Sequence, residues 1–251
     1  VITHRTLLPI FAAWQCLVAL ALADDTATQT PAPAKPNIIF ILTDDQGYGD
    51  LSCHGNPILK TPNLDKLHGE SLRLTDFHVA PMCTPTRGQL MSGRDALHTG
   101  ASSVCAGRSF LPRGTSTMAE IFRASGYRTG LFGKWHLGDS YPNLPHQRGF
   151  DRALYHLGWG ITSMPDTWQN DCFDPTLYAD GVKTKRTGYC TDIFFDEAMD
   201  FMRARRAANE PFFVYLPTNA PHWPHWVAEK YKAPYEGKGP AAFFGMLANL
   251  D

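Results

Sequence analysis

The run Pro36-Asn37-Ile38-Ile39-Phe40-Ile41-Leu42 constrains the fold of this chain most, because it is apolar at every position from 38 to 42 and is soon followed by two aspartates. Such a run, without alternation of polar residues, is typical of a central parallel strand that is covered on both faces. Residues 212–216 are a second run of this kind, and residues 127–132 predict a further strand. These segments predict a buried sheet.

Helix signals stand between the predicted strands. Thr61 and Pro62 open a helix that runs to about Ser71, with Thr61 as its cap and Pro62 in its first turn. Thr117-Met118-Ala119-Glu120 is a capping box, and Gly126 ends the helix that follows it. The alternation of strands and helices predicts an α/β fold with a mostly parallel central sheet and helices on both faces.

Three other segments complete the predicted organisation. Residues 192–208 have the pattern of an amphipathic helix, and residues 240–251 read as an apolar helix. Residues 139–190 carry Gly, Pro, Asp and aromatic residues without a clear period, so we interpret them as a long loop-rich insertion.

The N-terminal residues have the pattern of an export signal. Residues 1–23 combine a weakly basic start, a mainly apolar stretch and the A-x-A cleavage site Ala21-Leu22-Ala23, and residues 24–36 read as a flexible linker. We therefore expect a secreted or periplasmic protein; the alternative is an N-terminal membrane anchor, for which the apolar stretch is short. No stable membrane insertion is expected.

Cysteine usage fits export. Removal of the signal leaves Cys53, Cys83, Cys105, Cys172 and Cys190. If Cys83 is modified, four remain for up to two disulfides, and Cys172 with Cys190 is our preferred pair.

Charge and size narrow the classes of function. The 251 residues are 43% hydrophobic and 19% charged, and the formal net charge is −1. This composition is ordinary for a folded soluble protein and gives no basic surface for nucleic acid.

Chemically capable residues follow the predicted strands. Asp44-Asp45 follow the first, Lys134 and His136 follow the strand after Gly126, and His222 follows the strand that ends at Leu216. In α/β sheets, ligands bind at the carboxyl ends of the strands, and adjacent carboxylates suit calcium or magnesium. Each residue also has an ordinary interpretation, as a solvated turn, a surface charge or a packed histidine.

The stretch Cys83-Thr84-Pro85-Thr86-Arg87 predicts an unusual environment for a cysteine. Pro85 suits the first turn of a helix, and Gly93 is a plausible helix end. Cys83 would then lie at or just before a helix N-terminus, which favours an anion. Arg87, about one turn on, can reach back over the same place. An isolated cysteine could equally be a small buried apolar residue or half of a disulfide.

Two sequence motifs resemble the signatures of the type I, formylglycine-dependent sulfatases, a branch of the alkaline phosphatase superfamily. C-T-P-T-R-G-Q-L-M-S-G-R, residues 83–94, matches C-x-P-x-R with its apolar pair and [ST]-G-[RK] end. G-Y-R-T-G-L-F-G-K-W-H, residues 126–136, matches the second signature. The resemblance extends from Asn37 to about Leu250 and implies an alkaline-phosphatase-like α/β fold and hydrolysis of aryl or carbohydrate sulfate esters.

The resemblance also implies roles for individual residues. Asp44, Asp45 and the modified Cys83 match metal-binding positions, for calcium or alternatively magnesium. Cys83 matches the cysteine that a formylglycine-generating or anaerobic sulfatase-maturing enzyme oxidises to formylglycine, whose hydrate attacks sulfur. The other matched positions are Arg87 and Lys134, which neutralise sulfate and diol charge, His136 as base, and His222 as acid toward the leaving oxygen. The implied partners are a sulfated small molecule or glycan and the maturing enzyme.

Departures from the family pattern qualify these implications. Thr86 stands where Ser is common, and we find after His222 no segment that matches the family's later Asp-Asn or Asp-His pair and its further lysine near the leaving group. We therefore interpret residues 37–251 as the N-terminal portion of a sulfatase catalytic domain. Two alternatives stay open: a phosphodiesterase or phosphonate-ester hydrolase of the same superfamily, and an inactive truncated remnant that binds sulfated glycans.

Overall fold

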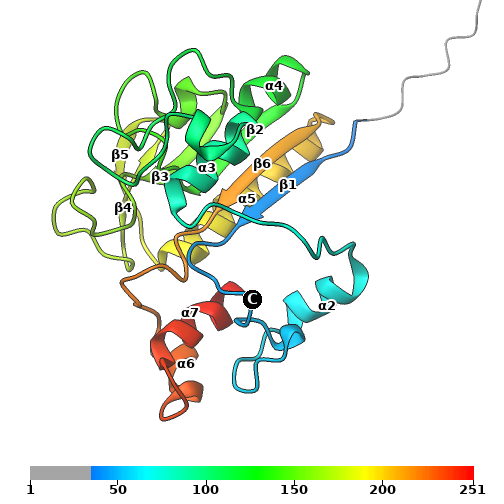
Figure 1. Cartoon of the computed structure of the whole chain (residues 1–251), viewed down its shortest axis with the longest axis vertical. Coiled ribbons are helices and arrows are strands. Elements are labelled where there is room, and N and C mark those ends of the chain that lie inside the picture. Colours follow the sequence, from blue (N-terminus) through cyan, green and yellow to red (C-terminus); the bar gives the residue numbers. More distant parts are fainter. Residues whose placement is uncertain (1–34) are drawn as a thin grey trace, which may run out of the picture. The chain divides into compact units, whose positions relative to one another are not determined.

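A six-stranded sheet forms the centre of the molecule, in the order β1-β6-β2-β3-β4-β5 (Figure 1). The computed structural model describes residues 35–251. The predicted signal peptide and all but the last two residues of the predicted linker lie outside this range. The strands are β1 (Ile38–Leu42), β2 (Arg128–Lys134), β3 (Arg152–His156), β4 (Thr176–Ala179), β5 (Val182–Lys185) and β6 (Phe212–Pro217). The first four in the sheet order run parallel, and β4 and β5 add antiparallel pairs.

Helices cover both faces of this sheet, as predicted. The described α-helices are α2 (Pro62–Glu70), α3 (Cys83–Ser92), α4 (Met118–Ala124), α5 (Cys190–Ala207), α6 (Glu229–Lys232) and α7 (Ala241–Leu250). Successive side chains of a strand point to opposite faces. Phe213 and Tyr215 of β6 accordingly pack in one core cluster with Met91 of α3 and Ala119 of α4. Val214 and Leu216 pack in a second cluster with Phe194 of α5.

The local helix predictions are mostly confirmed. Thr117 caps α4 through a complete capping box, and Gly126 follows the helix at φ 81°. Thr61 precedes α2 but does not cap it, which corrects our prediction. Its Oγ1 instead donates to the Asp65 carboxylate at 2.9 Å and accepts the Ser52 N–H at 2.9 Å, so the side chain is committed to the preceding turn η1 (Ser52–His54).

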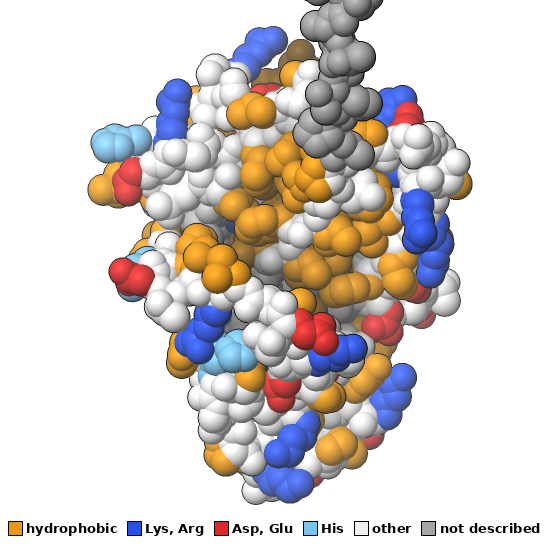
Figure 2. Space-filling model, turned by 90° about the vertical axis from the view of Figure 1, so that its right-hand side faces the viewer, with side chains coloured by type: hydrophobic (Ala, Val, Ile, Leu, Met, Phe, Trp, Pro, Cys, Tyr) orange, Lys and Arg blue, Asp and Glu red, His pale blue; other side chains and the backbone are white. Residues whose placement is uncertain are grey.

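β1 departs from the prediction of a strand covered on both faces. It pairs with β6 only, and Ile39 and Ile41 are each 51% exposed. The side of the molecule that contains β1 carries a broad apolar area (Figure 2). The apolar run therefore predicts the strand and its direction correctly, but among the described residues nothing covers one of its faces.

The segment 139–190 holds more structure than predicted. It contains β3, β4, β5 and the short 3-10 helix η3 (Pro145–Gln147). β3 has only five residues, and it is stabilised by parallel pairing with β2, a contact that a local pattern does not contain. The expectation of a loop-rich insertion is therefore corrected for these strands.

Cys172 and Cys190 are brought together without a disulfide. All five described cysteines are free thiols. The Cys190 N–H donates to the Cys172 carbonyl at 2.8 Å. A hydrogen bond with Cys190, together with burial, raises the pKa of the Cys172 thiol. The preferred pair is thus correct as a contact and not as a covalent bond.

The C-terminal helix α7 packs away from the sheet centre. Phe244 and Leu247 form a small core with Leu59 and with Tyr235 of the 3-10 helix η4 (Ala233–Tyr235). Asp251 accepts the N–H of Leu64 at 2.8 Å, which ties this region to α2. Within residues 35–251, none of the helices has the length and apolarity needed to cross a membrane.

Candidate active site

The polar residues predicted from the strand ends meet at one edge of the sheet. Because β1, β6 and β2 are parallel, their carboxyl ends lie together. Asp44 follows β1, Lys134 is the last residue of β2, and Asn219 to His222 follow β6. The Asp44 N–H donates to the Ala220 carbonyl at 3.1 Å, which joins the loops after β1 and β6.

Asp44, Arg87 and Lys134 form a buried ion cluster, which we call the inner cluster. Lys134 Nζ is in contact with Asp44 Oδ2, and Arg87 Nη2 lies 3.3 Å from the same oxygen. Arg87 Nη1 also donates to the Lys134 carbonyl. Arg87 thus reaches from α3 to the end of β2 and to Asp44, and it lines the same pocket as Cys83.

The cluster carries more positive than negative charge. Burial favours protonation of Asp44, but Arg87 and Lys134 outweigh it and hold the pKa of that carboxyl below its ordinary value. Burial lowers the pKa of Lys134, and the Asp44 charge works in the opposite direction. Beyond its ion pair, Lys134 Nζ has no hydrogen-bond partner in the described part of the chain. A buried, donor-rich and unsaturated site of this kind suits an oxyanion.

Cys83 is the first residue of α3, as predicted. The preceding Met82 provides no side-chain cap, so the first N–H groups of the helix are free of a capping side chain. Gly93 ends the helix at φ 66°. Cys83 is partly exposed, and with Asp44, Asp45 and Arg87 it lines a pocket of about 360 Å³.

His136 is a buried, neutral histidine two residues beyond β2. Its Nε2 lies 3.0 Å from the Val104 carbonyl, so this nitrogen carries the proton, and Nδ1 is buried without a partner among residues 35–251. Burial and the nearby Lys134 charge lower the pKa of His136 to about 3. The residue has φ 50°, a backbone region that is costly for a residue other than glycine and that recurs at functional sites.

Asp45 and His222 form an outer pair at the mouth of the site. His222 Nδ1 lies 2.6 Å from the Trp223 carbonyl and therefore donates to it, while Nε2 lies 3.7 Å from Asp45 Oδ2. Asp45 is exposed and has φ 63°, which Asp tolerates better than most residues. The pair is near but not hydrogen-bonded.

His156 is a site residue that the sequence analysis missed. It ends β3, directly beside Lys134 in the parallel register, and its Nε2 is buried without a partner in the described structure. Burial lowers its pKa to about 3. Its signal was present, since it follows a short apolar run, but that run lay within the segment interpreted as loops.

The predicted metal ligands are only partly assembled. Both cations of the inner cluster contact Oδ2 of Asp44, which leaves Oδ1 for another cation. Asp45 and Cys83 line the same pocket. However, the ligand atoms of Asp44, Asp45 and Cys83 do not lie within 4.8 Å of one another; within residues 35–251 only Cys53, His54 and His68 meet that condition.

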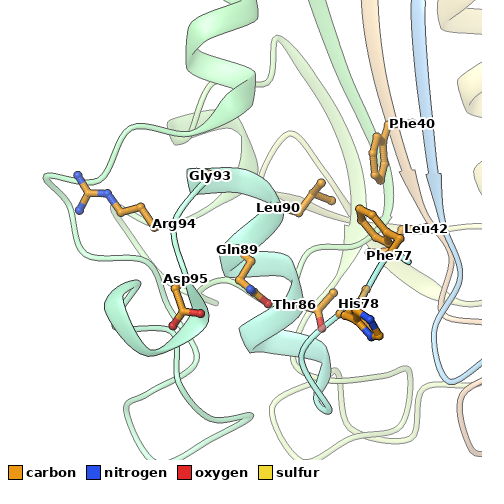
Figure 3. A pocket seen from close by; sticks show the side chains of 11 residues that line it. Phe40, Leu42, Phe77, His78, Thr86, Gln89, Leu90, Gly93, Arg94 and Asp95 are labelled. Atoms are coloured by element: carbon orange, nitrogen blue, oxygen red, sulfur yellow. The ribbon is translucent and has the colours of Figure 1, made fainter. Parts of the chain in front are cut away.

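An apolar hollow of about 370 Å³ adjoins this pocket. Phe40 of β1 and Leu90 of α3 lie on opposite sides of it (Figure 3). Leu42, Val79 and Thr86 line both the hollow and the Cys83 pocket. A ligand with an anionic group at Cys83 therefore has apolar surface beside it.

Comparison with known proteins identifies the family. The family described as Sulfatase matches residues 36–242. Human arylsulfatase A is 35% identical over 259 aligned positions, which cover 92% of this chain and 49% of that protein.

Two solved structures extend the likeness to the fold. The crystal structure of Ps i-CgsB has 29% identity and a TM-score of 0.77 over 86% of this chain and 52% of that one. BT4656, solved in complex with its substrate D-glucosamine-2-N,6-O-disulfate, has 28% identity and a TM-score of 0.68 over 81% of this chain and 38% of that one. The chain thus spans about half or less of the length of these three relatives. With both signatures and the inner cluster in place, the chain belongs to the sulfatase family.

Proposed function

We propose that the protein containing this chain hydrolyses sulfate esters at the Cys83 pocket. The observation that carries the proposal is the inner cluster: two buried cations share one oxygen of Asp44, and Asp44 and Arg87 line the same pocket as Cys83. Net positive charge, unused Lys134 donors and a helix N-terminus together provide a cradle for a sulfate group.

Each residue around the Cys83 pocket has a role in the proposed reaction that follows from its position. Lys134 and Arg87 bind sulfate oxygens and stabilise the charge that increases there as the ester bond breaks. His136 accepts a proton at Nδ1, which is neutral and has no competing hydrogen bond in the described structure. His222 Nε2 lies 3.7 Å from Asp45, which lines the Cys83 pocket, and in the imidazolium form this nitrogen can donate a proton to the leaving alcohol.

Two groups implied by the family fit the residues present. Asp44 Oδ1, Asp45 and Cys83 would hold a divalent metal, with calcium preferred to magnesium; the two carboxylates supply the oxygen ligands that either ion takes. Cys83 oxidised to formylglycine would supply the nucleophilic hydrated aldehyde, and the metal would favour its ionisation. Cys83 is partly exposed in its pocket, and a formylglycine-generating or anaerobic sulfatase-maturing enzyme would carry out this oxidation.

The substrate class follows from the pocket and its surroundings. The apolar hollow beside Cys83 suits the body of an aryl or sugar sulfate. The relative that was solved with a disulfated glucosamine supports a sulfated sugar. Export to the periplasm or outside the cell, as the leader pattern suggests, would place the enzyme where such glycans occur.

The test combines mass spectrometry with turnover. The whole natural protein that contains this chain is co-expressed with a maturing enzyme. After digestion, the peptide that contains Cys83 is expected to have the mass of the aldehyde or of its hydrate. Turnover of an aryl sulfate should exceed that of an aryl phosphodiester, and Cys83→Ala should abolish it, with Cys105→Ala as the matched control. An unmodified thiol, or binding of sulfated glycans without sulfate release, would overturn the proposal. Faster phosphodiester hydrolysis would favour the rival activity.

A further inference from the structure

We propose that Cys53, His54 and His68 form a second metal site, separate from the Cys83 pocket, for a transition metal such as Zn²⁺. One ligand atom of each residue lies within 4.8 Å of the other two. Cys53 and His54 belong to η1, and His68 lies in the last turn of the following helix, α2. None of the three lines the Cys83 pocket.

His54 is already oriented as a metal ligand. Its Nδ1 lies 2.7 Å from the Tyr48 carbonyl, so Nδ1 donates a proton there and Nε2 keeps its lone pair. The Tyr48 ring stacks on the imidazole, with centroids 4.2 Å apart and planes 14° from parallel. Metal-binding histidines characteristically donate their other N–H to a carbonyl or carboxylate, because that bond fixes the tautomer and the ring orientation.

His68 supplies an independent sign of a missing ligand. Its Nε2 is buried and has no hydrogen-bond partner among residues 35–251. Its ring meets that of His54 edge-on, at a centroid distance of 5.6 Å. A buried nitrogen without a partner costs free energy, and a metal ion between the two rings would satisfy it.

The neighbouring carboxylate of Asp65 fixes the backbone around the site and also accepts a hydrogen bond from the Cys53 thiol, which a bound metal would replace. Asp65 accepts the Cys53 N–H at 2.9 Å, the Ser52 hydroxyl at 2.6 Å and the Thr61 hydroxyl at 2.9 Å. These bonds fix η1 against the first turn of α2. The ligand set is therefore one sulfur and two imidazole nitrogens.

This ligand set selects the class of metal. Thiolate and imidazole suit Zn²⁺ and its neighbours, whereas calcium and magnesium take oxygen. Zn–S and Zn–N bonds of about 2.3 and 2.0 Å imply ligand separations of about 3.5 Å. Because the three ligand atoms lie within 4.8 Å of one another, the partly exposed side chains need to draw in by at most about 1.3 Å. Binding replaces the Cys53 thiol proton, which is released to solvent, and leaves a fourth position for water.

The experiment titrates the full chain with Zn²⁺ and, in parallel, with Co²⁺. Co²⁺ bound at this site should show thiolate-to-metal charge transfer in the near ultraviolet and the visible bands of a tetrahedral ion. Cys53→Ser should remove the charge-transfer band, and His68→Gln should weaken Zn²⁺ binding by at least about 10- to 100-fold, since loss of even an outer partner costs that much. Cys105→Ser is the matched control and should change neither.

A Cys83→Ser variant distinguishes metal binding at this site from metal binding in the Cys83 pocket. In Cys83→Ser the band and the Zn²⁺ affinity should persist. Loss of the band in Cys83→Ser with retention in Cys53→Ser would overturn the proposal. So would Co²⁺ binding without a thiolate band, or equal Zn²⁺ affinity in the wild-type chain and in a folded His68→Gln variant, with folding checked by circular dichroism.

Discussion

The inner cluster and the outer pair of the site each take one residue, Asp44 and Asp45, from the loop after β1, yet they are built differently. The side chains of Asp44, Arg87 and Lys134 are 5%, 2% and 0% exposed, and each touches another member. Those of Asp45 and His222 are 63% and 20% exposed and stand 3.7 Å apart. One half of the site is therefore part of the core, whereas the other half borders solvent.

This difference means that the buried half of the site is preorganised, whereas the exposed half is assembled when a ligand binds. Charges fixed in a low-dielectric interior stabilise developing charge without rearranging during the reaction. Exposed groups interact weakly through water and reach their working geometry only when a ligand bridges them. We infer that the inner cluster sets the oxyanion cradle during folding, while the outer pair is completed by substrate and metal.

The largest expected effect is that of Lys134→Ala. Within residues 35–251, the change leaves the buried Asp44 with Arg87 as its only ion-pair partner. Loss of one partner of a buried ion pair typically costs about 3–5 kcal/mol of unfolding free energy. If Lys134 binds sulfate as proposed, its removal should also lower kcat by about 10²- to 10³-fold. Denaturant unfolding and aryl sulfate turnover measure the two effects.

The control for Lys134→Ala is Lys66→Ala, on the exposed side of α2. It should change the unfolding free energy by less than about 0.5 kcal/mol. If Lys134→Ala proved as mild as its control, the inner cluster would not be a structural part of the core.

The sheet and the inner half of the site could be predicted because both depend on strands. Apolar runs place Asp44 and Lys134 at strand ends, and parallel strands bring those ends together. Cys83 could be placed at a helix start because Pro85 and Gly93 mark the limits of α3 locally. The predicted family, fold class and helices on both faces are confirmed.

The remaining features depend on contacts between distant segments. His156 joins Lys134 only through the pairing of β3 with β2, and the exposure of β1 depends on what lies beside it in the sheet. Cys53 and His68 approach one another because Asp65 ties η1 to α2. Thr61 has the residue type of a cap but an alternative partner in Ser52. Local patterns do not contain these contacts.

An intermediate effect is expected on acidification, through the histidines of the buried half. His136 and His156 have pKa values lowered from 6.5 to about 3, so they stay neutral in the folded chain at pH 5 while the unfolded chain takes up the protons. Stability therefore falls as the pH drops below about 6.5. Each histidine should contribute a loss of about 2 kcal/mol between pH 7 and pH 5.

The measurement is the unfolding free energy at pH 7 and pH 5 for the wild-type chain and for His156→Gln. The variant should lose about 2 kcal/mol less than the wild type on acidification. The exposed His98→Gln serves as control, because an exposed histidine contributes little to this difference. An unchanged pH dependence in His156→Gln would show that the buried half tolerates a charged imidazole.

The smallest effect on stability is expected at the outer pair. Asp45→Asn removes a contact of 3.7 Å at an exposed carboxylate, and exposed pairs contribute at most about 1 kcal/mol. Because Asp45 lines the Cys83 pocket, the same change should nevertheless raise the calcium concentration needed for half-maximal turnover. Asp50→Asn, on the same loop but outside that pocket, is the matched control. If Asp45→Asn lowered the unfolding free energy as much as Lys134→Ala does, the outer pair would have a structural role. If the variant stayed stable but needed more calcium, Asp45 would act in ligand binding alone, and the two halves of the site would remain distinct.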